Sequence, residues 1–221
     1  HLGSDDSEHQ AGLCVAMSRL GPNAWHLHTH HEWSNWMTTN FKNTPPWKSI
    51  KPPSGDLPAH PGKLRMVVDE LDVEHAPRYQ PTASATFCNI FVSDVLQAMG
   101  LQPGHWCDAN GEPADDGQPD TYEMNANRMA RWFKLHGPRN GWEEAERGVA
   151  SDAAARGHVV VVVWDSQHMR KPGHIAVMLP EGTIAQAGRS NFVGKTIREG
   201  FGQLTPRFYV HVPSGPHSAA P

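Results

Sequence analysis

The hydrophobic pattern of the first two thirds of the chain is helical. Residues 63–76 and 87–99 carry apolar positions three or four apart, the spacing of one helix face. The first pattern ends before Pro77 and the second at Gly100, as expected of helix ends. A third segment, 121–136, has the same periodicity and also stops at a glycine. We therefore predict three helices.

Short apolar runs of β type follow residue 157. The run HVVVVVWD (158–165) is almost wholly β-branched, which is typical of a strand buried on both faces. Three further runs follow between turn residues: GHIAVMLP (173–180), GTIAQAG (182–188) and RFYVHV (207–212). Helices followed by strands predict an α+β domain, with N-terminal helices packed on a central antiparallel sheet.

Residues 1–62 differ from this pattern because they are rich in Pro, Gly, His and Trp. The prolines prevent a long helix after Phe41. We predict an N-terminal arm over 1–62, whose tryptophans pack on the body or bind a ligand. The folded domain then spans 63–212, and 213–221 form a disordered tail.

Composition and charge exclude several classes of protein. The 221 residues are 38 % hydrophobic and 19 % charged, which suits one folded domain. The net charge of −4 provides no basic field for nucleic acid, and no apolar run reaches the roughly 18 residues of a membrane span. Residues 1–10 do not resemble a signal peptide, so we expect any export signal to be absent or removed.

Cys88 is the first candidate for chemistry. It lies in the segment TFCNIFVSDVL, where Thr86 can cap the helix and place Cys88 second in it. The free N–H groups and the positive dipole end of a helix start stabilise a thiolate, which a cysteine nucleophile requires. The alternative is a small buried core residue. Three cysteines are a poor disulfide framework, although a pair between Cys14 and Cys107 would leave Cys88 free.

A base for Cys88 is offered by His174, which begins an apolar strand in PGHIAVML. Gln186 follows twelve residues later, and a three-residue hairpin loop over 180–182 would place it opposite Ala176. Gln186 would then be a diagonal neighbour of the imidazole and could orient it. Asn191 is the rival orienting residue.

These motifs together resemble the papain-like NlpC/P60 and CHAP hydrolases of bacterial cell walls. The segment CNIFVSDVL is similar to the family's nucleophile helix, and GHIAVMLPEGTIAQA to its histidine hairpin. The resemblance covers about residues 63–212. Gln186 stands where many members have His, Asn, Asp or Glu, and a neutral amide stabilises an imidazolium less than a carboxylate does.

The resemblance implies a papain-like fold and cleavage of amide or peptide bonds in peptidoglycan, without a cofactor. It implies Cys88, His174 and Gln186 as catalytic residues, and Tyr79 or Gln80 as partners of the Cys88 N–H in binding the oxyanion. Tyr79 has packing beside Pro77 as an alternative. Other side chains could bind the stem peptide: Trp106, Trp164 and Asn191.

Other functions remain open on the sequence. A cell-wall hydrolase could be a phage lysin, a remodelling enzyme or a secreted antibacterial effector delivered to the periplasm or cell wall, and an effector implies an immunity protein as partner. A non-catalytic cell-wall or glycan-binding protein and a thiol acyltransferase are the alternatives. The histidines of HLHTHHE invite a metal site, but neighbouring ligands on a Pro-rich arm rarely form one, so we expect none: His26, His28, His30 and His31.

Overall fold

A six-stranded antiparallel sheet forms the centre of the protein in a computed structural model, which describes residues 35, 44–50, 62–168 and 171–212. The strand order is β3-β8-β4-β5-β6-β7. The strands are β3 (Trp142–Ala145), β4 (Val160–Trp164), β5 (His174–Met178), β6 (Ile184–Gln186), β7 (Phe192–Lys195) and β8 (Arg207–His211).

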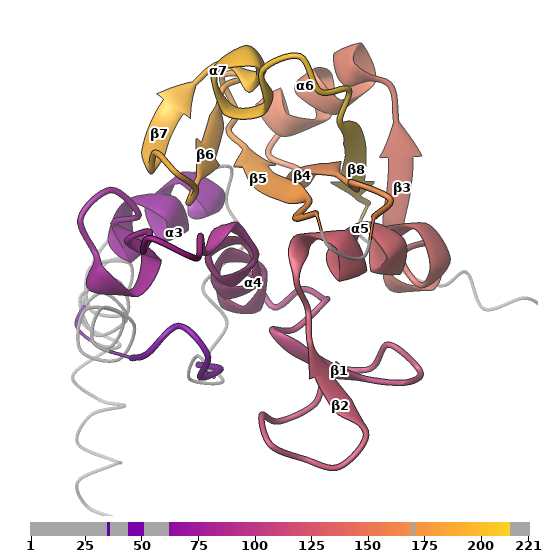
Figure 1. Cartoon of the computed structure of the whole chain (residues 1–221). Coiled ribbons are helices and arrows are strands. Elements are labelled where there is room, and N and C mark those ends of the chain that lie inside the picture. The colour runs from indigo at the N-terminus through magenta and orange to yellow at the C-terminus, as the bar shows by residue number, and fades with distance from the viewer. Residues whose placement is uncertain (1–34, 36–43, 51–61, 169–170, 213–221) are drawn as a thin grey trace, which may run out of the picture.

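Helices cover both faces of this sheet, so the domain has three layers (Figure 1). One face packs against α3 (Lys63–Leu71), α4 (Cys88–Ala98) and α5 (Ala126–Leu135). The other face packs against α6 (Arg147–Ala155) and the short α7 (Ile197–Phe201). The predicted α+β class is therefore confirmed, although α6 and α7 lie between strands in sequence and were not predicted.

The valine run of β4 is buried on both faces, as its composition predicts. Val161 and Val163 belong to the core beneath α4 and α5, whereas Val160 and Val162 belong to the core beneath α6 and α7. All four side chains are at most 1 % exposed. Because neighbouring residues of a strand point to opposite faces, the run supplies both layers at once.

The third predicted helix begins later than expected. Thr121–Glu123 form strand β2, which pairs with β1 (Trp106–Asp108) in a separate two-stranded ribbon. The helix α5 starts at Ala126, where the Asn125 side chain accepts a hydrogen bond from the Arg128 N–H at 3.0 Å. This N-cap fixes the helix start and leaves the polar residues before it to the ribbon.

Part of the predicted arm belongs to the body. The buried Arg78 guanidinium, in the 3₁₀ turn Pro77–Tyr79, binds Asp94 of α4 at 2.6 Å and also donates to backbone carbonyls of residues 44, 45 and 48. Ile50 is 5 % exposed and joins the core beside α4. Residues 44–50 are thus fixed to the helix that carries Cys88. The remainder of the arm, apart from residues 35 and 62, and the tail 213–221 lie outside the described residues.

Within the described part of the chain, no helix is long and apolar enough to cross a membrane.

Candidate active site

Cys88 begins α4. The N-cap is Phe87, not the expected Thr86, and no side chain caps this end. The Phe87 carbonyl accepts the first helical hydrogen bond from the Phe91 N–H at 3.0 Å. Cys88 is therefore the first helical residue rather than the second. The unpaired N–H groups of this first turn remain beside the thiol.

The environment of the thiol is more buried than expected. Cys88 is 5 % exposed, and its polar neighbours are the backbone groups of Ile175, Asn89 and Cys88 itself. Burial raises the pKa of the Cys88 thiol, and these backbone hydrogen bonds lower it by less. The expected depression of the Cys88 pKa by the helix start is thus wrong, because desolvation of the thiolate outweighs the favourable backbone groups.

His174 and Gln186 meet as the predicted register requires. Val177 pairs with Ala185 and Met178 with Ile184, and the Leu179 N–H donates to the Thr183 carbonyl at 2.8 Å, which leaves a three-residue loop over 180–182. This register continues to Ala176 opposite Gln186, so Gln186 lies diagonally next to His174. The imidazole Nε2 and the Gln186 Oε1 are 2.7 Å apart. The hydrogen-bond partner of the His174 imidazole is therefore Gln186 and not Asn191.

A second hydrogen bond fixes the tautomer of His174. The Gln186 Nε2 donates to the Ser190 carbonyl at 3.1 Å, so the Gln186 Oε1 must be the acceptor facing the imidazole. Nε2 of His174 then carries the proton, and Nδ1 keeps its lone pair. Burial lowers the pKa of His174, and the bond to Gln186 raises it by less. The ring is therefore a neutral base at neutral pH.

Close packing holds the His174–Gln186 pair in place. The ring of Phe201 lies 4.7 Å from the imidazole, measured between centroids. A Cβ added at Gly200 would come within 2.6 Å of the Gln186 Oε1, and one at Gly188 within 3.2 Å of its Nε2. Both glycines let the backbone approach the amide closely. Gly200 and Phe201 come from α7, so that helix completes the pocket of the pair.

The thiol and the imidazole approach the start of β5 from opposite faces of the sheet. Cys88 packs with Ile175 beneath α4, whereas His174 lies with Phe201 on the α7 side. Within the described residues no hydrogen bond joins Cys88 to His174; the sulfur instead has the Ile175 backbone as neighbour. Both groups lie at the start of β5, so a substrate that contacts both must bind at this end of the sheet. Catalytic contacts often tighten only when substrate binds.

Trp164 is placed beside His174. It is the last residue of β4 and pairs with His174 across the antiparallel ladder, so the two side chains share a face. Trp164 is half-buried. The structure thus brings this predicted substrate-binding residue next to the imidazole.

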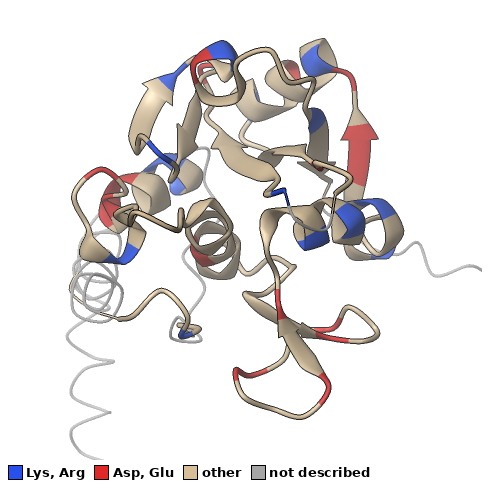
Figure 2. Ribbon diagram, in the orientation of Figure 1, with Lys and Arg blue, Asp and Glu red and all other residues tan. Residues whose placement is uncertain are grey.

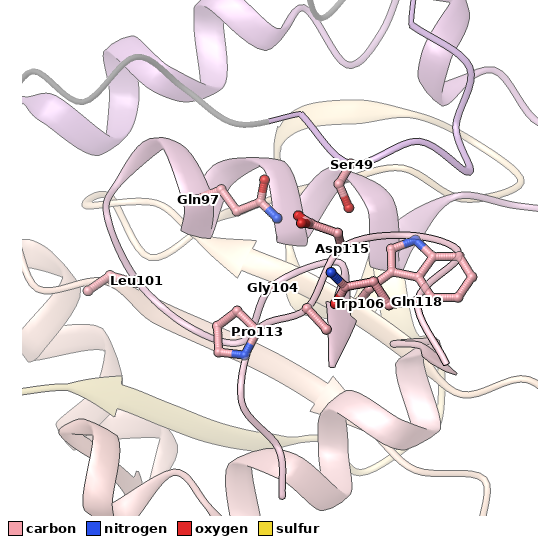
Figure 3. Close-up of a pocket in the computed structure, with 9 residues that line it drawn as sticks. Ser49, Gln97, Leu101, Gly104, Trp106, Pro113, Asp115 and Gln118 are labelled. Carbon is pink, nitrogen blue, oxygen red and sulfur yellow. The ribbon is translucent and has the colours of Figure 1, made fainter. Parts of the chain in front are cut away.

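Trp106 lies elsewhere, on the β1–β2 ribbon. It lines a cavity of about 400 Å³ together with Gln97, Leu101 and Gln118 (Figure 3). Its indole N–H donates to the Trp47 carbonyl at 3.3 Å. Gln97 is nine residues after Cys88 in α4, about 13 Å along a helix. This position, remote from Cys88 along α4, does not favour the expected role of Trp106 in binding the stem peptide.

The two candidates for the oxyanion have other partners. The Tyr79 hydroxyl donates to Asp94 at 2.7 Å, in the buried network of Arg78, and the Tyr79 ring packs edge-on against Phe91. Burial raises the pKa of Tyr79 well above its ordinary value. The Gln80 amide donates to the carbonyls of Glu74 and Ala76. Tyr79 follows its packing alternative, and neither side chain is directed at Cys88 by these contacts.

Asn191 is a structural clamp. Its Oδ1 accepts from the Gly188 N–H, and its Nδ2 donates to the carbonyls of Val73 and Tyr79, all at 2.9 Å. These bonds use both ends of the amide and tie the β6–β7 turn to the segment after α3. The expected contact of Asn191 with substrate is therefore not favoured by its position.

Sequence reasoning missed a second buried amide, Asn127 of α5. Its Oδ1 accepts from the Ser166 N–H at 3.0 Å, and its Nδ2 donates to the Lys171 carbonyl at 2.9 Å. A Cβ at Gly173 would lie 2.4 Å from the Asn127 Oδ1. The glycine before His174 is thus required by this clamp, which fixes the connection leading into β5. The only signal in the sequence was an asparagine on an apolar helix face.

The remaining cysteine and metal expectations concern other parts of the chain. Cys107 is a free, fully buried thiol whose pKa burial raises to about 12, and Cys14 lies outside the described residues. The histidines 26–31 also lie outside them. Among the residues that are described, no group of three or more His, Cys, Asp or Glu could hold a metal ion.

Comparison with known protein families and with curated proteins finds no match to this chain.

Proposed function

We propose that this protein is a cysteine peptidase or amidase that hydrolyses peptidoglycan stem peptides on a papain-like fold. One observation carries the proposal: the Nε2 of His174 binds the Gln186 Oε1 at 2.7 Å, at the start of β5, where the Cys88 thiol contacts the Ile175 backbone from the other face. A free thiol, a neutral imidazole with an available Nδ1 and an orienting amide are the parts of a thiol hydrolase.

The two shifted pKa values favour a neutral pair at rest. The pKa of Cys88 is raised and that of His174 is lowered, so the proton stays on sulfur until a substrate arrives. Nδ1 then takes this proton as the sulfur attacks the carbonyl carbon. The resulting imidazolium gives the proton to the leaving amine when the C–N bond breaks. Water, deprotonated by the same nitrogen, releases the acid product and restores the thiol.

The oxyanion of the tetrahedral intermediate is assigned to the helix start. Backbone groups of Cys88 and Asn89 already face the sulfur, and the first N–H groups of a helix lack partners within it. Because Tyr79 and Gln80 are engaged elsewhere, the backbone supplies this site. One oxyanion-hole donor is typically worth about 100- to 1,000-fold in rate.

Peptidoglycan is proposed as substrate because of the sequence resemblance. A secreted or periplasm-delivered enzyme follows from that substrate, as a lysin, a remodelling enzyme or an antibacterial effector. The effector role would require an immunity protein as partner.

A second candidate is a non-catalytic cell-wall binding protein. It is favoured by the 5 % exposure of Cys88, which is typical of a structural thiol. An acyltransferase would use the same Cys88 and His174 and transfer the acyl group to an amine instead of water.

Digestion of purified peptidoglycan by the full chain, followed by mass spectrometry of the muropeptides, tests the proposal. We expect new fragments with one added water per cleaved bond. Cys88→Ala and His174→Ala should each reduce the rate by more than about a thousandfold, since both groups act as one unit. Circular dichroism and the urea midpoint control for folding. Fragments formed by folded Cys88→Ala at the wild-type rate would reject the thiol mechanism, and products carrying an added amine would indicate a transferase.

A further inference from the structure

A cavity of about 350 Å³ opens at the end of the sheet where β4 ends and β8 begins, next to the start of β5 at His174. Val163 pairs with Arg207 and Trp164 pairs with His174, so the end of β4 and the starts of β5 and β8 lie at the same end of the sheet. The cavity lies where β4 and β8 reach this end of the sheet, and α5 closes it on one side. Its polar and aromatic lining includes Arg131, Lys134, Trp164, Asp165, Gln167 and Arg207.

The lining of this cavity is cationic. Arg131, Lys134 and Arg207 supply three positive side chains, and Asp165 is the one carboxylate among the lining residues. Figure 2 shows the contrast on the ribbon, with Lys and Arg on α5 and Asp and Glu on β3 and on the β1–β2 ribbon. The cavity is therefore suited to a negatively charged group.

The ion pairs within the lining leave much of this charge available. Arg131 and Asp165 are 3.6 Å apart, and the Arg131 side chain is 53 % exposed. Arg207 contacts Glu144 at 3.4 Å, and both side chains are about half exposed. Exposed pairs of this kind are weak, typically about 0.2–1 kcal/mol. A ligand carboxylate with bidentate geometry can compete with them.

We propose that this cavity binds a free carboxylate of the peptide substrate, two or three residues from the bond that is cleaved. Strands in a sheet lie about 4.8 Å apart, so the backbone of Arg207 on β8, which is level with Ile175, is about 10 Å from the β5 backbone beside His174, two strands away. An extended peptide advances about 3.3 Å per residue, so two or three residues span this gap. The enzyme then selects peptides that carry this free carboxylate. This inference rests on the proposed function, because it takes the carboxylate to be part of the substrate.

Binding to the full-length Cys88→Ala protein tests the site without turnover. The probes are an N-acetylated alanine dipeptide with a free carboxylate, the same dipeptide as its carboxamide, and inorganic phosphate. Amide NMR shifts at Thr205 and Gln167 give each Kd at low salt, where screening is weak. We expect the acid to bind about tenfold more tightly than the carboxamide, since one charge-assisted contact is lost.

Three further variants in the same background locate the contact. Lys134→Gln and Arg207→Gln should each remove most of the preference for the acid. Arg156→Gln, at the exposed C-cap of α6, removes the same charge away from the cavity and should leave the preference unchanged. Circular dichroism confirms that each variant is folded.

Several results would overturn the proposal. Equal binding of acid and carboxamide would reject it. It would also be rejected if Arg156→Gln lost the preference for the acid as strongly as Lys134→Gln and Arg207→Gln do. Tighter binding of phosphate without discrimination between the dipeptides would identify a phosphate site instead. A protein that prefers the acid but never cleaves peptidoglycan refutes only the proposed function. A protein that cleaves peptidoglycan but does not prefer the acid refutes only this site.

Discussion

The Cys88 thiol on one face of the sheet and the His174 imidazole on the other are held in different ways. The thiol is placed by the backbone: it begins α4, touches the Ile175 backbone and is otherwise surrounded by the core. The imidazole is placed by side chains in series, through Gln186 to the Ser190 carbonyl. Substitutions can therefore disturb the imidazole while the core remains intact, whereas the position of the thiol depends on the core itself.

This difference also separates two amides that look alike in sequence. Gln186 and Asn191 are five residues apart on one hairpin, and each is a side-chain amide next to at least one apolar residue. Gln186 bonds to the imidazole, whereas Asn191 bonds only to backbone groups. The first is expected to affect the rate and the second the stability.

Between the two amides, the larger expected effect is therefore that of Gln186→Ala on catalysis. Without the Gln186 Oε1 as acceptor, the proton of His174 is no longer held on Nε2, and the imidazole ring can turn. We expect a loss of about 100-fold in kcat, within the range of acid–base catalysis. Asn191→Ala should retain kcat and lower the free energy of unfolding by about 1–3 kcal/mol, because the carbonyls of Val73 and Tyr79 lose their donor.

Rates on peptidoglycan and urea midpoints for both variants measure this separation. If Asn191→Ala lowers kcat as strongly as Gln186→Ala while remaining folded, the division of roles between the two amides is wrong.

A smaller effect is expected from one methyl group at Gly200. In Gly200→Ala the new Cβ would lie 2.6 Å from both the Gln186 Oε1 and the Ile184 Cδ1. Gln186 must move, and we expect kcat to fall by about tenfold, with a loss of about 1–3 kcal/mol in stability from overpacking.

Gly148→Ala is the matched control for this change. Gly148 lies in α6, and a Cβ there meets nothing within 4 Å. Alanine should therefore keep kcat and stabilise the helix by up to about 1 kcal/mol. Kinetics and thermal melts of both variants provide the comparison. Equal kcat values in the two would show that the packing of α7 against Gln186 is unimportant for the rate.

The part of the site that the sequence predicted is the part governed by local rules. Strand alternation and a three-residue loop determine that Gln186 lies next to His174, and both can be read from residues 174–186. The burial of β4 on two faces follows likewise from its valines. Such features depend on neighbours in the chain.

The features that were missed depend on distant segments. Tyr79 is directed away from Cys88 by Asp94, fifteen residues later. Position 173 requires a glycine because the Asn127 side chain of α5 occupies the space of a Cβ. The raised pKa of Cys88 arises from burial by the assembled core, which the helix position alone does not reveal. The β1–β2 ribbon replaced a helix start because Asn125 caps α5.

The pH dependence of stability should show the buried imidazole directly. The pKa of His174 in the folded protein lies below its ordinary value of 6.5, so the unfolded chain binds this proton more readily. The stability linked to His174 is therefore fully present above about pH 6.5 and is lost as the pH falls towards the folded pKa. Urea midpoints measured from pH 7.5 downwards should fall less steeply in His174→Gln than in the wild type. Parallel curves would contradict a lowered pKa.

The smallest expected effect is a shift of the acid limb of the rate profile by Gln186→Glu. The proposed mechanism requires neutral His174, so kcat/KM should decline only below the ordinary pKa of 6.5, because burial lowers the pKa of His174. A carboxylate at position 186 can accept the same proton from Nε2 and also stabilises the imidazolium, which raises the His174 pKa. The acid limb of Gln186→Glu should therefore move to higher pH by about one unit, with the maximal rate reduced less than in Gln186→Ala. Rates on peptidoglycan from pH 4.5 to 8 measure both quantities. An acid limb that stays in place in this variant would show that the side chain at 186 is not in contact with the catalytic base during turnover.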